Sequence, residues 1–214
     1  MLLGAALIFA PLNIHAQEQV YLSNLGESPS FGEEFSDSMW LAQLFVTGTN
    51  PGGYDLNSVQ LSLDLTGAPA GNVAVYLYGS TESGSPAAQK AEIGSETPSA
   101  SGNYTFSTSG ISLSPSTGYW IAVTTTAAAS PYEWSTSSDY NYISSDNWSL
   151  QATTPWSSTD GSHWESYIGL VLPPYQLAVT ATPAPEPGIL PLAGIGLAII
   201  VLSRRRFETA NLCE

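Results

Sequence analysis

The stretch between residues 132 and 167 holds the densest group of side chains that could do chemistry. Four tryptophans fall within it, Trp134, Trp148, Trp156 and Trp164, with tyrosines interspersed among them. Flat aromatic faces beside Asn, Asp and Ser side chains suit the stacking of sugar rings, so one interpretation is a carbohydrate platform. The favoured interpretation is that these rings pack in the core and loops of a β-sandwich, where aromatic residues are common.

The acids of the same stretch could supply the carboxyl pair of a glycoside hydrolase. They are Glu133, Asp139, Asp146, Asp160 and Glu165. The reaction needs two carboxyl groups at a defined separation, one of them with a raised pKa. These acids lie in polar, Ser-rich segments in which we expect them to be solvated. We therefore predict no catalytic residue and no enzymatic activity, and glycoside hydrolysis is the weakest alternative.

Residues for metal or nucleophile chemistry are few. The chain has two histidines, His15 and His163, and a single cysteine, Cys213. This is too few for a zinc site built from His and Cys, so we predict no metal ligand and no cofactor. A structural calcium ion, held by acids and carbonyls, is the one alternative, although no Asp-x-Asp-x-Asp-Gly loop is present. Nucleophile-elbow and phosphate-binding motifs are also lacking.

The charge distribution excludes nucleic acid as a partner. Residues 17–187 contain sixteen Asp and Glu but only one strong base, Lys90, which gives this stretch a net charge of −15. Binding to phosphates requires clusters of Lys and Arg. An acidic surface of this kind is typical of a soluble, exported domain.

A proline-rich motif near the C-terminus separates this acidic part from an apolar segment. Pro185, Glu186, Pro187 and Gly188 stand directly before residues 189–203, which carry no charge. Proline fixes φ and lacks an N–H donor, so we expect residues 183–188 to form an extended, semi-rigid linker.

The apolar segment and the arginines behind it predict a membrane anchor. A helix over residues 189–203 rises only about 22 Å, against roughly 30 Å of hydrocarbon. Arg204, Arg205 and Arg206 can extend this span by snorkelling, and they favour the cytoplasmic side. We predict one transmembrane helix over residues 189–203 and a basic cytoplasmic tail over residues 204–214. A buried or interfacial helix is the alternative.

The order of these elements resembles the PEP-CTERM sorting signal of Gram-negative bacteria. Pro185-Glu186-Pro187, a short apolar segment and an arginine cluster follow one another over residues 183–206. The resemblance implies recognition by an exosortase, a membrane-embedded cysteine transpeptidase that processes its substrates at the Pro-Glu-Pro element. Such proteins are typically exported in species that make exopolysaccharide. One difference is that residues 207–214 follow the arginines, where the family usually ends sooner.

The N-terminal residues predict export. Residues 1–16 form an apolar run that ends in the small residue Ala16, which is typical of a signal peptide, although the usual basic start is missing. A short buried strand is the alternative. Signal peptide and anchor together predict a type I topology, with an inner-membrane anchor followed by transfer to the envelope, surface or extracellular matrix.

Residues 17–182 predict an all-β domain. Apolar and polar residues alternate in short runs, which are separated by turn signals such as Gly71-Asn72 and Asp160-Gly161. Eight to ten such strands indicate an antiparallel β-sandwich or jelly roll. Residues 33–45 are also compatible with a helix, but strand is favoured, and Trp120 lies in an alternating run that indicates a structural role. The candidate strands cover residues 41–47, 56–65, 72–78, 102–108, 119–124 and 175–179.

Parts of this domain resemble the exported domain type called choice-of-anchor R. The resemblance rests on residues 102–106, 113–123 and 132–134. This type occurs with alternative C-terminal anchors, PEP-CTERM among them, and it implies no catalytic residues. The expected function is a non-enzymatic, membrane-anchored surface or matrix protein that an exosortase sorts. A carbohydrate-binding module that acts on exopolysaccharide is the alternative.

Overall fold

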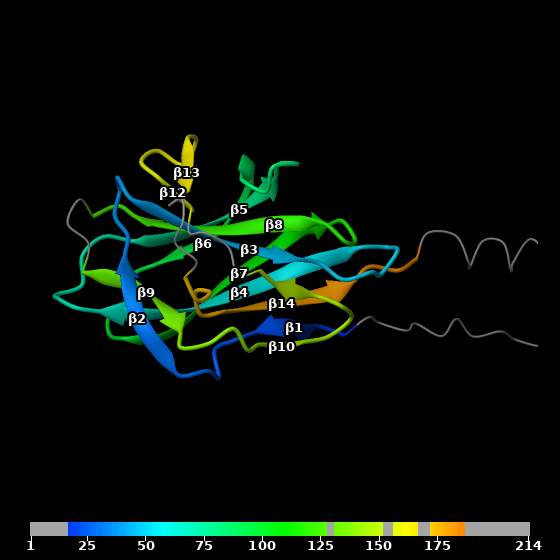
Figure 1. Cartoon of the computed structure of the whole chain (residues 1–214), viewed down its shortest axis with the longest axis horizontal. Helices are drawn as coiled ribbons and strands as arrows, with labels where there is room; N and C mark the ends of the chain where they lie inside the picture. The colour runs from blue at the N-terminus through cyan, green and yellow to red at the C-terminus, as the bar shows by residue number, and fades with distance from the viewer. Residues whose placement is uncertain (1–16, 128–130, 152–155, 167–171, 187–214) are drawn as a thin grey trace, which may run out of the picture.

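The computed structural model describes residues 17–127, 131–151, 156–166 and 172–186 of the chain. These residues form fourteen β-strands and no helix. The strands make two antiparallel sheets that pack in a sandwich-like arrangement (Figure 1). The predicted all-β domain is therefore confirmed. Within the described ranges no helix is long and apolar enough to span a membrane, and the predicted signal peptide, membrane helix and basic tail lie outside these ranges.

The first sheet contains the strands at both ends of the described chain. Its seven strands pair in the order β10-β1-β14-β4-β9-β2, and β7 pairs with β4 beside this path. The strands are β1 (Gln19–Ser23), β2 (Pro29–Glu34), β4 (Tyr54–Leu65), β7 (Gly102–Leu113), β9 (Tyr132–Ser137), β10 (Ile143–Ser144) and β14 (Leu177–Pro183).

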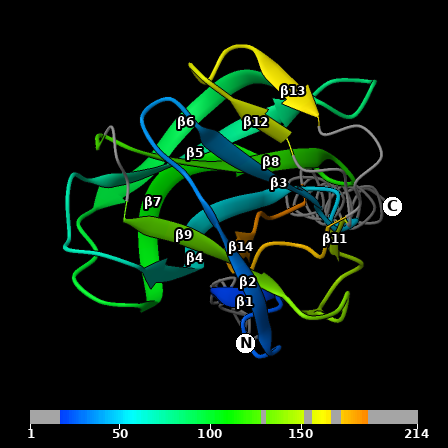
Figure 2. The same cartoon turned by 60° about the vertical axis from the view of Figure 1, so that its left-hand side comes forward.

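The second sheet carries Trp40, Tyr76, Tyr78, Trp120, Trp156 and Trp164 on its strands. Its seven strands pair in the order β13-β12-β3-β8-β5-β6, and β11 pairs with β3. They are β3 (Trp40–Val46), β5 (Val73–Ser80), β6 (Pro86–Glu96), β8 (Gly118–Thr125), β11 (Ser149–Leu150), β12 (Trp156–Ser158) and β13 (Trp164–Ser166). Figure 2 shows the β12–β13 hairpin on the side of this sheet that faces away from the first sheet.

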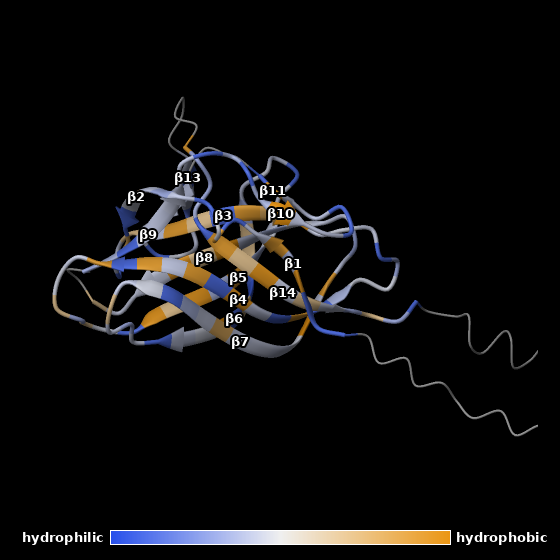
Figure 3. Ribbon diagram, turned by 90° about the horizontal axis from the view of Figure 1, so that it is seen from below, coloured by the Kyte–Doolittle hydropathy of each residue, from blue (hydrophilic) through white to orange (hydrophobic). Residues whose placement is uncertain are grey.

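The main core lies between the two sheets and follows the alternation of the strands. On β4, Val59, Leu61 and Leu63 are fully buried, whereas the residues between them are half-exposed. Figure 3 shows the same pattern as orange and paler segments that follow one another along β14 and β4. Burial of one such side chain contributes about 1.5–3 kcal/mol, so the alternation predicted from the sequence also accounts for how the sheets hold together.

The second sheet differs from the first because both of its faces carry apolar side chains. On β8, Tyr119, Ile121 and Val123 belong to the main core. Trp120 and Ala122 point to the other face and are equally buried, in a second, smaller cluster. Strands covered on both faces read as continuous apolar runs, and β8 does so.

The domain has fourteen strands among its described residues, where eight to ten were predicted. Gly71 and Gly161, both expected in turns, have φ values of +70° and +71°, which glycine adopts without strain. Residues 33–45 form the end of β2 and most of β3, with a narrow turn between Ser36 and Met39. The strands outside the predicted runs are β1, β2, β6 and β9 to β13. Of these, β10 to β13 have only two or three residues each, too few to show a period in the sequence.

Candidate functional site

Two of the four tryptophans considered for a carbohydrate platform lie in the core. Trp134 is 0% exposed, stacks on Tyr175 with ring centroids 4.5 Å apart, and donates a hydrogen bond from Nε1 to the Gln176 carbonyl at 3.0 Å. Trp148 is 1% exposed and packs against other core rings. For these two residues the interpretation as core aromatics is confirmed and the platform is wrong, because they have no face open to a ligand.

Trp156 and Trp164 lie instead on the face of the second sheet that points away from the core. Trp156 stands opposite Ala42 of β3. Trp164 stands opposite Ser158 of β12, and Ser158 stands opposite Trp40 of β3. Directly opposite residues on neighbouring strands point to the same face of a sheet. This register therefore places Trp156 and Trp164 on the same face as the smaller apolar cluster, which contains Ala42.

Six aromatic side chains from strands β3, β5, β8, β12 and β13 gather on this face. We call them the outer aromatic face, and they form three contacting pairs with centroid separations of 5.2, 5.3 and 6.3 Å: Trp40 with Tyr76, Tyr78 with Trp164, and Trp120 with Trp156.

The outer aromatic face has a buried floor and a partly open surface. Tyr78 and Trp120 are at most 1% exposed, whereas the other four rings are half-buried and keep part of their surface in contact with solvent. The alternating run around Trp120 predicts a structural role, and its burial fits that role. Trp40, Tyr76 and Tyr78 were missed because they lie far from residues 132–167 in the sequence.

The turn of the β12–β13 hairpin is fixed onto this face by Gly161. The Tyr78 hydroxyl donates a hydrogen bond to the Gly161 carbonyl at 2.9 Å. A Cβ atom at position 161 would lie 3.0 Å from both the Trp40 ring and the Tyr78 hydroxyl, so the close approach requires glycine. Burial raises the pKa of Tyr78 to about 12, so the hydroxyl remains a donor at any physiological pH.

A groove of about 460 Å³ lies between this hairpin turn and the start of β6. We call it the rim groove, and it is lined by residues 86–89 and 160–162. Gln89 stands opposite Tyr78 across the β5–β6 pair, with 3.4 Å between their side-chain oxygens. Since Tyr78 in turn contacts Trp164, the polar groove borders the outer aromatic face directly.

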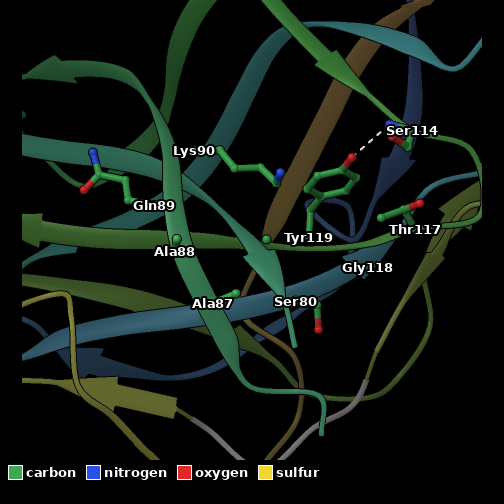
Figure 4. Close-up of a pocket in the computed structure, with 10 residues that line it drawn as sticks. Ser80, Ala87, Ala88, Gln89, Lys90, Ser114, Thr117, Gly118 and Tyr119 are labelled. Atoms are coloured by element: carbon green, nitrogen blue, oxygen red, sulfur yellow. Dashed lines mark hydrogen bonds between the residues drawn. The ribbon is translucent and has the colours of Figure 1, made fainter. Parts of the chain in front are cut away.

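A second depression, of about 440 Å³, shares residues 87–89 with the rim groove but opens beside Lys90. Figure 4 shows Lys90 extending toward the Tyr119 ring, while Gln89 points to the other side of β6. The Lys90 Nζ atom lies 5.8 Å from the ring centroid, within the range of a cation–π contact. The Tyr119 hydroxyl accepts a hydrogen bond from the Ser114 amide at 2.8 Å. A basic residue, Lys90, therefore lines this depression, whereas an acidic residue, Asp160, lines the rim groove.

An ion pair caps the hairpin turn at the end of the rim groove. The Asp160 carboxylate accepts hydrogen bonds from the Ser162 and His163 amides at 2.7 and 2.9 Å, and from His163 Nδ1 at 2.8 Å. The hydrogen bond from the His163 ring, followed by those from the two amides, holds the pKa of Asp160 well below its usual range. The same pair raises the pKa of His163.

We expect the hairpin turn to depend on pH through this pair. For His163, whose pKa is raised from 6.5, the stabilisation is complete below pH 6.5 and is lost as the pH rises through the raised pKa. For Asp160, whose pKa is lowered from 3.8, it is complete above pH 3.8 and is lost on strong acidification. The pair is therefore fully formed between these two values. An NMR titration should give His163 a pKa above 6.5, and Asp160→Asn should lower it toward 6.5. Equal values in the two proteins would contradict the pairing.

The acids considered for glycoside hydrolysis lie on separate elements. Glu133 of β9 stands between Asp64 of β4 and Glu34 of β2, in a row of like charges. Asp146 accepts a hydrogen bond from the Tyr54 hydroxyl. Asp139 accepts hydrogen bonds within a tight turn, Asp160 caps the hairpin turn, and Glu165 lies on β13. In the described part of the chain no three His, Cys, Asp or Glu side chains are placed to hold a metal ion.

The beginning of the predicted sorting motif lies where the chain leaves the folded domain. After β14 ends at Pro183, the Ala184 amide donates to the Gly53 carbonyl and the Ala184 carbonyl accepts from Asn50 Nδ2, each at 3.0 Å. Pro185 and Glu186 follow and are exposed. The rest of the motif, Pro187 and Gly188, and the arginines at 204–206 lie outside the described residues.

Comparisons with known proteins found no family model that matches the chain, and no curated protein or solved structure with significant similarity to it.

Proposed function

We propose that the protein is an exported, membrane-anchored protein of the cell surface or extracellular matrix, without catalytic activity of its own. Its C-terminal tail would be a sorting signal that an exosortase recognises and processes at Pro185-Glu186-Pro187. Residues 1–16 would be the signal peptide, residues 189–203 the membrane helix, and Arg204, Arg205 and Arg206 the cytoplasmic stop.

The observation that carries this proposal is the exposure of Pro185 and Glu186 directly after the last strand of the domain. Backbone and side-chain hydrogen bonds hold the chain up to Ala184. The next two, Pro185 and Glu186, are exposed. A processing enzyme must bind its substrate in an accessible, extended segment, and exposed chain ends beyond a domain are the preferred sites of cleavage.

The position of the two chain ends supports the same topology. Gln19 near the start of β1 pairs with Ala181 near the end of β14, so the chain enters and leaves the domain side by side (Figure 1). A leader and an anchor attached at one end of the molecule would tether the domain to the membrane there. The opposite end, with the loops around β9 and β2, would face outward.

Intact mass and fractionation of the protein in its own host test this proposal. We expect the wild-type protein to lose its tail and to leave the inner membrane, whereas Glu186→Ala should retain residues 189–214 and stay in that membrane. The expected effect is complete, because Glu186 belongs to the recognised motif and is exposed at the end of the described domain.

Glu82→Ala is the matched control, since Glu82 is also an exposed acid but lies in the turn before β6. It should be processed like the wild-type protein. If the wild-type protein and Glu186→Ala both keep the tail in the inner membrane, the tail is a plain anchor and processing by an exosortase is ruled out.

A further inference from the structure

We propose that the outer aromatic face and the rim groove beside it form a binding site for a neutral polysaccharide chain. This inference concerns the ectodomain alone and does not depend on how the tail is processed. The six rings of this site come from five strands. Of the four tryptophans between residues 132 and 167, only Trp156 and Trp164 belong to it.

The half-buried rings supply the stacking surface of this site. Trp40, Tyr76, Trp156 and Trp164 keep part of their surface open, and the buried rings of Tyr78 and Trp120 support them from below. Aromatic rings in mutual contact are held at fixed angles, so they offer a preformed apolar surface. Binding to a preformed surface avoids much of the entropy cost of ordering side chains.

The rim groove supplies the hydrogen-bonding groups that a sugar needs at the edge of such a surface. Gln89 can both donate and accept, the Asp160 carboxylate can accept further hydrogen bonds, and the Ser162 hydroxyl can do either. Binding sites for small organic groups combine apolar walls with a few placed polar groups. Pyranose rings fit this combination, because they carry apolar C–H faces and a periphery of hydroxyl groups.

The charge of the domain selects a neutral chain. Residues 17–186 carry sixteen acids and Lys90 as the only Lys or Arg. Close to the site, Asp160 lines the groove, and Glu92 stands opposite Tyr76 on β6. Lys90 points to the other side of β6, toward Tyr119 (Figure 4). An anionic polysaccharide would meet repulsion here, since the imidazolium of His163 beside the groove is already paired with Asp160.

A cationic polysaccharide is disfavoured for a different reason. Acids are distributed over the whole domain, so a cationic chain would bind over much of its surface rather than at one place. What distinguishes this face from the rest of the surface is the group of aromatic rings. Among the described residues outside it, open aromatic side chains such as Phe31, Tyr140, Tyr104 and Tyr142 do not form a cluster with this face.

Calorimetric titration of the full chain, with tryptophan emission as a second readout, tests the site. The probes are neutral oligosaccharides (cellohexaose, laminarihexaose, xylohexaose) and the neutral fraction of the host polysaccharide, set beside alginate and chitosan oligomers. We expect saturable binding of at least one neutral probe, and neither charged oligomer should compete with it. Trp156→Ala and Trp40→Ala should raise the Kd about tenfold or more, as for central aromatic contacts.

Gln89→Ala keeps the test independent of folding, because Gln89 is exposed and its removal leaves the aromatic rings in place. It should raise the Kd roughly three- to tenfold, the loss of one hydrogen bond. Tyr140→Ala and Lys90→Ala are controls and should leave the Kd unchanged. The proposal fails if folded protein binds none of the neutral probes, if it prefers alginate or chitosan, or if Trp156→Ala and Gln89→Ala both bind as the wild type does.

Discussion

Replacing Trp148 by alanine is expected to lower the free energy of unfolding by about 3–5 kcal/mol. The indole is 1% exposed and stacks on Tyr21 and Phe45, with centroid separations of 5.0 and 5.6 Å. It also meets Tyr54 edge-on at 5.0 Å. Removal of the ring leaves a cavity whose walls are other rings anchored on β1, β3 and β4, and these cannot close fully. Domains of this size have a total stability of about 5–15 kcal/mol, so the variant should lose a large fraction of it.

Urea unfolding followed by circular dichroism measures this effect, with Trp156→Ala as the matched control. Trp156 is half-buried and lies on a three-residue strand near the edge of its sheet. Its removal opens the outer aromatic face and creates no enclosed cavity, so we expect a loss below about 2 kcal/mol. Equal losses in the two variants would show that the outer aromatic face contributes as much to stability as the main core, and it would then be a second core rather than a surface.

The fold could be predicted largely from the sequence because alternation reports directly on burial. The residues of β4 alternate in the sequence, and the structure buries Val59, Leu61 and Leu63 as expected. The strands β10 to β13 could not be predicted, because two or three residues carry no measurable period. Their place in the sheets is decided by pairing with distant strands, such as β12 with β3.

The site could be predicted only in part, because the sequence does not show which tryptophans are buried in the core and which lie on the outer face. Trp134 precedes a Ser-rich stretch and Trp164 follows one. Nevertheless β9 turns the first into the core, and β13 places the second on the outer face. Register across strands far apart in the sequence makes this difference. One signal was available in advance: in β8, Trp120 and Ala122 alternate with core residues, so both faces had to be covered.

A second large effect on stability is expected at Asn24, in the segment that follows β1. Its side chain is 1% exposed, accepts a hydrogen bond from the Leu177 amide at 2.7 Å, and donates one to the Tyr175 carbonyl at 3.0 Å. The Asn24 amide also donates to the Leu177 carbonyl. These bonds continue the β1–β14 pairing one residue beyond the end of β1, in the register set by Ser23 opposite Ala178.

Asn24→Leu should therefore lower the free energy of unfolding by about 2–4 kcal/mol. Leucine has nearly the same volume, but it can neither accept from the Leu177 amide nor donate to the carbonyl before β14. Each buried polar group left without its partner costs about 1–3 kcal/mol, and the apolar gain of leucine offsets part of the sum. Urea unfolding measures the change, and Asn141→Leu is the control, because Asn141 is exposed and its side chain bonds to Asp139 within its own turn.

The control variant should lie within about 0.5 kcal/mol of the wild-type protein. If Asn24→Leu does so as well, apolar packing alone holds β1 against β14. That outcome would matter for the proposed topology, because β1 and β14 are the strands at which the chain enters and leaves the domain. A loss of the expected size would instead show that a buried polar contact fixes the two ends side by side, where the leader and the anchor are proposed to begin.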